Sequence, residues 1–415
     1  MPLKSLPADL FLHVVGLLED SDRVSVLLSC KGWNAALSAA PRLMPTTVIK
    51  GFGAVVPELK DDLPNYSEYN ELAVRQAAVQ SQQQRARVLE TAAALSPGTG
   101  RVKLTRFDDQ PDMVAGVLAL LPASLLSLEL DTPCSGPVLA AAGRFSQLEQ
   151  LAIPGNAAAI DWRMHPRAAV RRSLGYLTRL RLDCRQPEFV LENVEYEYVR
   201  CDCQPIPAAL PAAVAAATRL ERLAVEARWS PALVTLCDTL PPSLRQLELE
   251  LLELRPDDDL PAMVVALSTL RPPLHLSLGL CTSPLGSLSG DEDEHFPPVS
   301  LPPLAGIRCL CELRLEGYVR PPPDWGQLTG LSALRLNLLS DDSLASLSYA
   351  FPNLTRLEST TRPGPGLDPK QAAQQLPRLR QLIFHNQSDM KWGRRLRELL
   401  PGLDVADLKL VQAVF

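Results

Sequence analysis

The sequence predicts an α/β fold: a curved solenoid of repeated strand–helix units, with parallel strands on its concave side and helices on its convex side, preceded by a small all-helical domain. Three observations predict it. A short leucine pattern recurs along most of the chain, helix-like segments separate its recurrences, and the first forty residues carry apolar stripes at helical spacing.

The recurring pattern is a large apolar residue, two others, Leu, two others, Leu, one other residue and usually a further apolar residue. It is clear in FSQLEQLAI, LGYLTRLRL, LTGLSALRL and LPRLRQLIF, and weaker in RVKL and LHLSL. The final apolar-x-apolar steps start at residues 102, 128, 151, 180, 223, 247, 276, 313, 334, 357 and 382. Most intervals therefore lie between 21 residues (313 to 334) and 29 residues (151 to 180).

Each L-x-L step predicts a short strand, because two residues separated by one other lie on the same face of a strand. Helix-like segments between the steps predict one helix per repeat; they cover residues 111–122, 207–218, 260–270, 340–351 and 368–376. The long interval from 180 to 223 suggests a divergent strand within 190–199, and the interval from 276 to 313 contains an insertion at 283–298. Stacked units would bury a continuous core rich in leucine and alanine.

Over about residues 100–410 the chain resembles the leucine-rich repeat family, in which the strands line the concave side. The resemblance implies that the residue between the two core leucines, and the one after them, face that side. These positions are Glu129 and Asp131, Arg181 and Asp183, Ala224 and Glu226, Glu248 and Glu250, Arg314 and Glu316, Arg335 and Asn337, Glu358 and Thr360, and Ile383 and His385.

The concave positions provide a hypothesis for substrate binding. The candidate binding residues are Glu129, Asp131, Arg181, Glu226, Glu248, Glu250, Arg314 and Arg335. A partner with a basic patch would contact the acidic early positions, Glu129, Glu226, Glu248 and Glu250. The alternative is that these are ordinary solvated strand residues.

The first forty residues predict three short helices. Leu10, Val14, Leu17 and Leu18 form one helical stripe, and Pro7 suits the start of that helix. A second helix would carry Val24, Leu27 and Leu28, and a third would carry Trp33 and Leu37. So small a unit cannot bury all of this apolar surface by itself, so we expect either the solenoid or a partner to cover it.

These same residues resemble the F-box family, whose pattern of Leu-Pro, acidic-Leu, apolar, Cys and Trp positions they match over about residues 3–44. The matching residues are Leu6, Pro7, Asp9, Leu10, Val14, Leu18, Val24, Leu28, Cys30 and Trp33. The resemblance implies docking on a Skp-type adaptor, and through it on a cullin scaffold, by Leu6, Pro7, Leu10, Val14, Leu17, Leu18, Val24, Leu28 and Trp33. The repeats would then hold an unknown protein substrate of a cullin–RING (SCF-type) ubiquitin ligase.

Two alternatives remain open for the N-terminal helices and the function. The helices could be a degenerate cap on the solenoid, and the chain a leucine-rich-repeat scaffold or regulatory binding protein with no ligase role. The expected organisation is an F-box-like domain at 1–44, a linker at 45–100 and a solenoid at 101–415. Within the linker, residues 67–95 predict a helix, with a flexible connection as the alternative.

Composition narrows the function further. A net charge of −6 over 415 residues argues against general affinity for nucleic acid or for anionic membranes, and no uncharged run is long enough for a transmembrane helix. The nine cysteines include no C-x-x-C pair, so we expect no metal, no cofactor, and reduced thiols in the cytoplasm, the nucleus or both. GSLSG at 286–290 has Leu288 where a nucleophilic serine would stand, and we expect no enzymatic activity.

Overall fold

The computed structural model describes residues 46–51, 66–95, 97–105, 107, 111–131, 138, 141–153, 177–189, 199–282, 298–317, 319–320, 322–338, 351–359, 369–384 and 390–407. The chain forms two compact units. The first unit runs to Val199 and also takes Ala216–Leu220, and the second consists of Arg200–Ala215 and the residues from Glu221 onward. Each unit is considered by itself.

The first unit contains five parallel strands in sequence order. They are β1 (Thr47–Lys50), β2 (Arg101–Thr105), β3 (Ser127–Asp131), β4 (Gln150–Ile153) and β5 (Arg179–Asp183). The long helix α4 (Tyr66–Ala93) packs on α5 (Pro111–Leu120), where Gly116 faces Leu89. The predicted helix at 67–95 is confirmed, and α5 matches the segment predicted at 111–122.

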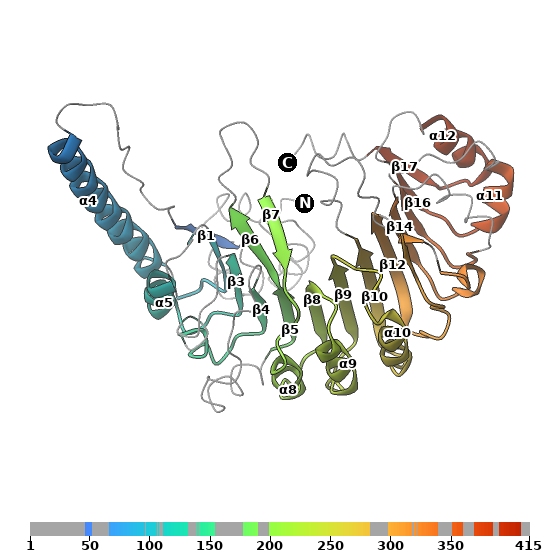
Figure 1. The fold of residues 1–415 in the computed structure, drawn as a ribbon, viewed down its shortest axis with the longest axis horizontal. Coiled ribbons are helices and arrows are strands. Elements are labelled where there is room, and N and C mark those ends of the chain that lie inside the picture. Colours follow the sequence, from blue (N-terminus) through green and yellow to red (C-terminus); the bar gives the residue numbers. More distant parts are fainter. Residues whose placement is uncertain are drawn as a thin grey trace, which may run out of the picture. The chain divides into compact units, whose positions relative to one another are not determined.

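The second unit contains eight parallel strands that pair in sequence order (Figure 1). They are β8 (Arg222–Arg228), β9 (Gln246–Leu252), β10 (His275–Cys281), β12 (Leu310–Gly317), β14 (Ala333–Leu338), β15 (Arg356–Ser359), β16 (Gln381–Phe384) and β17 (Asp404–Asp407). A small separate sheet pairs β11 (Val299–Ser300) with β13 (Val319–Arg320). The 3-10 helix η5 (Trp325–Gln327) precedes β14.

All eleven predicted L-x-L steps lie in strands, and their register confirms the repeat. In the first unit Val102 pairs with Leu128, and Leu128 pairs with Leu151. In the second unit Leu334 is aligned with Leu313 on one side and with Leu357 on the other. Equivalent leucines therefore form rows across the sheet, as stacked leucine-rich repeats require.

The register shifts at one point, between β10 and β12. Leu276 pairs with Leu310, but the next residue, Ser277, pairs with Glu312, so Cys311 is an extra residue in β12. The bulge aligns Leu313, the first leucine of the β12 step, with Leu278, whereas uninterrupted pairing from Leu276 and Leu310 would align it with Gly279. The sequence spacing did not predict this bulge.

Helices precede several strands of the second unit: α8 (Leu210–Ala215), α9 (Pro231–Asp238), α10 (Leu260–Ser268), α11 (Pro369–Gln375) and α12 (Met390–Leu399). α10 begins where the Asp259 carboxylate accepts a hydrogen bond from the Ala262 backbone N–H at 3.0 Å, and Pro261 lies in its first turn. α8, α10 and α11 match predicted segments, whereas α9, α12, β1 and β17 were missed. The helix predicted at 340–351 lies outside the described residues except for its last position.

The core of the second unit lies between the strands and these helices. Leu247, Leu276, Leu278, Leu280 and Leu315 are completely buried. Near η5, the buried ring of Trp325 meets that of Phe351 edge to face, with ring centroids 5.6 Å apart. The Asp324 carboxylate accepts hydrogen bonds from the backbone N–H groups of Leu304 and Ala305, which ties the preceding loop to this core.

Of the segment 190–199, in which a divergent strand was predicted, the structure describes Val199 alone. Residues 190–198 lie outside the described part of the chain, and β6 (Arg185–Phe189) and β7 (Val199–Cys203) flank them. The three helices predicted within 1–44 also lie outside it. Of the helices that the structure does describe, none combines the length and hydropathy that crossing a bilayer requires.

Candidate functional site: the charged face of the second unit

Because side chains alternate along a strand, the second unit has two contrasting sheet faces. The leucine face carries Leu247, Leu276, Leu278, Leu313 and Leu334 and belongs to the core. The charged face carries the intervening residues. Its central residues are Glu250 on β9, Cys281 on β10, Arg314 and Glu316 on β12, Arg335 on β14, and Arg356 and Glu358 on β15.

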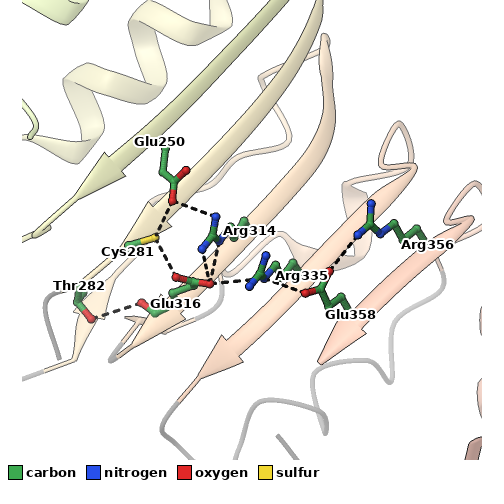
Figure 2. A network of polar contacts seen from close by, with 8 residues as sticks. All are labelled: Glu250, Cys281, Thr282, Arg314, Glu316, Arg335, Arg356 and Glu358. Carbon is green, nitrogen blue, oxygen red and sulfur yellow. Dashed lines mark hydrogen bonds and ion pairs between the residues drawn. The ribbon is translucent and has the colours of Figure 1, made fainter. Parts of the chain in front are cut away.

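Arg314 links two carboxylates of the charged face, Glu250 and Glu316 (Figure 2). One of its terminal nitrogens, Nη1, is 3.0 Å from Glu250 Oε1, and the other, Nη2, is 2.8 Å from Glu316 Oε1. Its Nε also donates a hydrogen bond to Glu316 Oε1 at 2.8 Å. Burial lowers the pKa of Arg314, but the attraction of Glu250 and Glu316 more than offsets this, so the pKa is raised and the charge is secure.

The network continues across the next two strands. Arg335 Nε lies 3.5 Å from Glu316 Oε1 and 3.2 Å from Glu358 Oε1, close enough for ion pairing but without hydrogen-bond geometry. Arg356 Nη2 lies 3.2 Å from Glu358 Oε2. Five successive contacts thus join six residues of alternating charge, from Glu250 to Arg356, with three carboxylates and three guanidinium groups.

Gly279 allows this network to cross β10. It pairs with Glu250 of β9 on one side and with Arg314 of β12 on the other, so a side chain here would stand between them. A Cβ at residue 279 would lie only 3.2 Å from Glu250 Cγ. The absence of a side chain leaves room for the Glu250 carboxylate to reach Arg314 two strands away.

Cys281 and Thr282 close the network at the end of β10. The Cys281 thiol lies 3.6 Å from Glu316 Oε2, and the Thr282 hydroxyl donates to the Glu316 carbonyl oxygen at 3.4 Å. Burial, followed by the nearby Glu316 and Glu250 carboxylates, raises the pKa of the Cys281 thiol well above its ordinary value, while Arg314 acts weakly in the opposite direction. Cys281 is therefore a neutral thiol near pH 7 rather than a nucleophile.

The predicted binding residues of the second unit have different environments. Glu248 is exposed, Glu250, Arg314 and Arg335 belong to the network, and Glu226 is only 8% exposed. A basic partner could therefore reach Glu248 directly, whereas the Glu250 carboxylate already has a cationic neighbour. The sequence indicated the face of these residues but not their mutual pairing.

The predicted residues of the first unit are considered separately. Glu129 forms an ion pair with Lys103, whose Nζ is 2.6 Å from Glu129 Oε1, and Arg181 is exposed on β5. Asp131 is the last residue of β3, and its side chain is outside the described part. The predicted adaptor-binding residues, Leu6, Pro7, Leu10, Val14, Leu17, Leu18, Val24, Leu28 and Trp33, also lie outside the described residues.

Six residues of the network were not predicted as binding residues: Gly279, Cys281, Thr282, Glu316, Arg356 and Glu358, of which Glu316 and Glu358 were predicted only as concave positions. Arg356 precedes its leucine step, and its partner Glu358 follows two residues later on the same face. The general alternation of a strand could have identified Arg356. The roles of Gly279 and Cys281 depend on the register across β10, which the sequence pattern did not provide. Among the described residues, no three or more His, Cys, Asp and Glu side chains are grouped to hold a metal ion.

No protein-family model matches the chain. No curated protein matches it either. Among solved structures, it is similar to an internalin of Listeria monocytogenes, at 13% identity and a TM-score of 0.37, over 75% of this chain and 80% of that one. A chain in the octameric complex of Latrophilin 3, Unc5D and FLRT2 (LRR) is 15% identical with a TM-score of 0.24, over 73% of both chains.

A third similar structure is the leucine-rich-repeat ectodomain of the receptor kinase GASSHO1/SCHENGEN3 from Arabidopsis thaliana, in complex with CASPARIAN STRIP INTEGRITY FACTOR 2. The identity is 15% and the TM-score 0.24, over 75% of this chain and 44% of that one. The parallel strands and their aligned rows of leucines are shown by the strand register of this chain itself.

Proposed function

We propose that the chain is a protein-binding scaffold without catalytic activity and that the charged face of the second unit is its binding surface. The observation that carries the proposal is the chain of ion pairs from Glu250 to Arg356, on the face opposite the leucine core. The exposed fractions of its Arg side chains are 33% for Arg314, 35% for Arg335 and 52% for Arg356, so a partner can reach them.

The arrangement favours recognition for two physical reasons. Ion pairs hold long side chains in fixed positions before binding, which reduces the conformational entropy that association would cost. Alternating positive and negative groups select a partner whose charges are complementary in the same order, while similar charges in the wrong order repel it. We therefore expect a folded protein partner with a mixed-charge surface.

Site-specific photo-crosslinking tests this proposal. A photoreactive residue would replace Glu248, which is exposed beside the network, and in a matched chain would replace Val265, which is 68% exposed on α10. A partner captured at residue 248 but not at residue 265 would then be purified for affinity measurements. Capture at both positions to an equal extent would contradict a specific binding surface.

The affinity of the purified partner provides the decisive measurement. We expect Arg335→Glu to weaken binding by about tenfold or more, and to reduce the salt dependence of the affinity, because it places a repulsive charge within the recognised pattern. Val265→Glu changes charge by one on α10 and should leave the affinity unchanged. An affinity that is unaffected by Arg335→Glu would overturn the proposal.

We also propose, as a second candidate, that the scaffold serves a cullin–RING ubiquitin ligase. The observation that favours it is the F-box-like pattern of Leu6-Pro7, Leu10, Val14 and Trp33. Binding of a purified Skp-type adaptor to the full chain, and to a chain without residues 1–44, would test it. Val14→Asp should abolish adaptor binding, whereas Val79→Asp, at a position 53% exposed on α4, should not. Adaptor binding that survives loss of residues 1–44 would exclude this role.

A further inference from the structure

An open pocket of about 400 Å³ lies where strands of the second unit begin. Its lining residues come from the starts of β8, β9, β10, β12 and β14. They are Glu221, Arg222, Arg245, Gln246, His275, Leu276, Ser277, Cys311, Glu312 and Ser332. The pocket shares no residue with the ion-pair network from Glu250 to Arg356, so it is a separate site.

The pocket contains a thiol next to an imidazole. Cys311 is the extra residue at the bulge between β10 and β12, and its Sγ lies 3.4 Å from His275 Nδ1. The thiol also lies 3.4 Å from the Cys309 carbonyl oxygen, so its proton has two possible acceptors. Among the cysteines whose side chains the structure describes, Cys311 is the one that is not buried.

Charged groups of both signs surround this pair. Arg222 and Arg245 are exposed, and neither guanidinium group forms a hydrogen bond or an ion pair with the described residues. Glu221 and Glu312 provide two carboxylates, of which Glu312 accepts a hydrogen bond from Ser277 Oγ at 3.3 Å. A ligand with two or more carboxylates and an ammonium group would complement this set of charges.

We propose that Cys311 is a site of reversible thiol–disulfide exchange with a small peptide-like disulfide that carries carboxylates, of which glutathione disulfide is the test case. Arg222 and Arg245 bind the carboxylates of the incoming disulfide, Glu221 or Glu312 binds its ammonium group, and His275 accepts the thiol proton. The product is a mixed disulfide on Cys311 that occupies the pocket.

The exchange proceeds by one substitution at sulfur. The Cys311 thiol proton passes to His275 Nδ1, and the resulting thiolate attacks one sulfur of the disulfide. A new S–S bond forms at Cys311 Sγ while the original S–S bond breaks, and the departing thiolate takes the proton from His275. Cys311 is oxidised to a disulfide and the other half of the small molecule is reduced to a thiol, so no further oxidant is needed.

The environment of Cys311 explains why the imidazole matters. Burial raises the pKa of the Cys311 thiol and the Glu312 carboxylate adds to this, although a hydrogen bond from the Leu276 backbone lowers it. The thiol is therefore protonated near pH 7, and proton transfer must accompany attack. An adjacent base that accepts the thiol proton accelerates the reaction most at a pH where little of the thiol is ionised.

The test uses the full chain, glutathione disulfide and site-resolved mass spectrometry of the modified peptides. We expect Cys311 to react at least about tenfold faster than Cys309, because Cys309 is 2% exposed. His275→Gln should slow modification of Cys311 by about tenfold at pH 7.5, and this difference should narrow as pH rises and thiolate forms without the imidazole. Equal reaction of Cys309 and Cys311 would overturn the site.

Charge selectivity provides an independent measurement. Cystamine is a dicationic disulfide without carboxylates, so the double variant Arg222→Gln/Arg245→Gln should slow exchange with glutathione disulfide by about tenfold and should not slow exchange with cystamine. Unfolding temperatures of all variants would verify that the pocket remains folded. If His275→Gln reacts like the unmodified chain at every pH, or if both disulfides respond equally to the Arg substitutions, the proposal is wrong.

Discussion

The two faces of the sheet in the second unit are formed by the same strands but are stabilised by different interactions, apolar packing on one face and ion pairs on the other. On the leucine face, Leu276, Leu278 and Leu280 are completely buried, and equivalent positions are filled by leucine in neighbouring strands. On the charged face, opposite charges from different strands form ion pairs, and the Arg side chains remain partly exposed. The leucine face therefore determines whether the sheet forms, while the charged face can vary between strands because its energetic contribution is smaller.

Replacing one buried leucine tests most directly whether the leucine face stabilises the sheet. Leu278→Ala should lower the free energy of unfolding by about 3 kcal/mol, because it removes buried methyl groups and leaves a cavity between well-packed strands. Urea denaturation would measure the loss. Val265→Ala, on the exposed side of α10, serves as the control and should change stability by less than about 0.5 kcal/mol. A similar loss for both variants would show that the leucine face is not special.

Alkaline pH tests the buried thiol of Cys281 on the charged face. The raised pKa of Cys281 means that above about pH 9, the ordinary value of the thiol, the unfolded chain loses this proton while the folded chain keeps it. The free energy of unfolding should then fall as pH rises, by up to about 1.4 kcal/mol per pH unit from this residue.

Cys281→Ser isolates this contribution, because serine does not titrate in this range. The stability difference between the original chain and Cys281→Ser should be constant from pH 7 to 8 and should change in favour of the variant above pH 9. Urea denaturation at each pH would measure it. A difference that does not vary up to pH 10 would show that Cys281 titrates alike in the folded and unfolded chains.

Neutralising one carboxylate should have a smaller effect than removing a leucine. Glu316→Gln leaves Arg314 and Arg335 without their shared carboxylate, and we expect a loss of about 1 kcal/mol, reduced because both guanidinium groups are about one third exposed. Raising the salt concentration should shrink this loss. Glu248→Gln is the control, since Glu248 is exposed and outside the ion-pair network. A loss that does not depend on salt would contradict an electrostatic origin.

The smallest change in the free energy of unfolding is expected for Gly279→Ala, because a stabilising and a destabilising contribution oppose each other. Gly279→Ala reduces the conformational freedom of the unfolded chain, but its Cβ would press on Glu250, so we expect a change in the free energy of unfolding below about 0.5 kcal/mol. The coupling between Glu250 and Arg314, measured by a double-mutant cycle, should nevertheless decrease. An unchanged coupling would show that the network does not depend on an open path across β10.

The regular part of the fold could be predicted from the sequence because each L-x-L step marks a strand with one apolar face. All eleven L-x-L steps lie in strands for this reason. β1 and β17 were missed because TVIK and DVAD contain no leucine step, and α9 was missed although Leu233, Leu236 and Cys237 have helical spacing. The leucine periodicity identifies the elements that repeat, and it does not identify those that depart from the repeat.

The candidate site was predictable only in part. Strand alternation correctly placed Glu250, Arg314, Glu316, Arg335 and Glu358 on one face. The pairing of Glu250 with Arg314 across β10 was not predictable, because it depends on the bulge at Cys311 and on Gly279, which lies between the two residues on β10. The predicted adaptor-binding surface within residues 1–44 remains a prediction.

The bulge at Cys311 limits where this chain can be truncated or joined to repeats of another protein. Repeats up to β10 and repeats from β12 onward are offset along the strand direction, so their motifs are not interchangeable modules. If β12 paired with β10 without the bulge, Leu278 would lie opposite Glu312 instead of Leu313. Truncations and chimaeras should therefore keep β10 and β12 together as a single indivisible block.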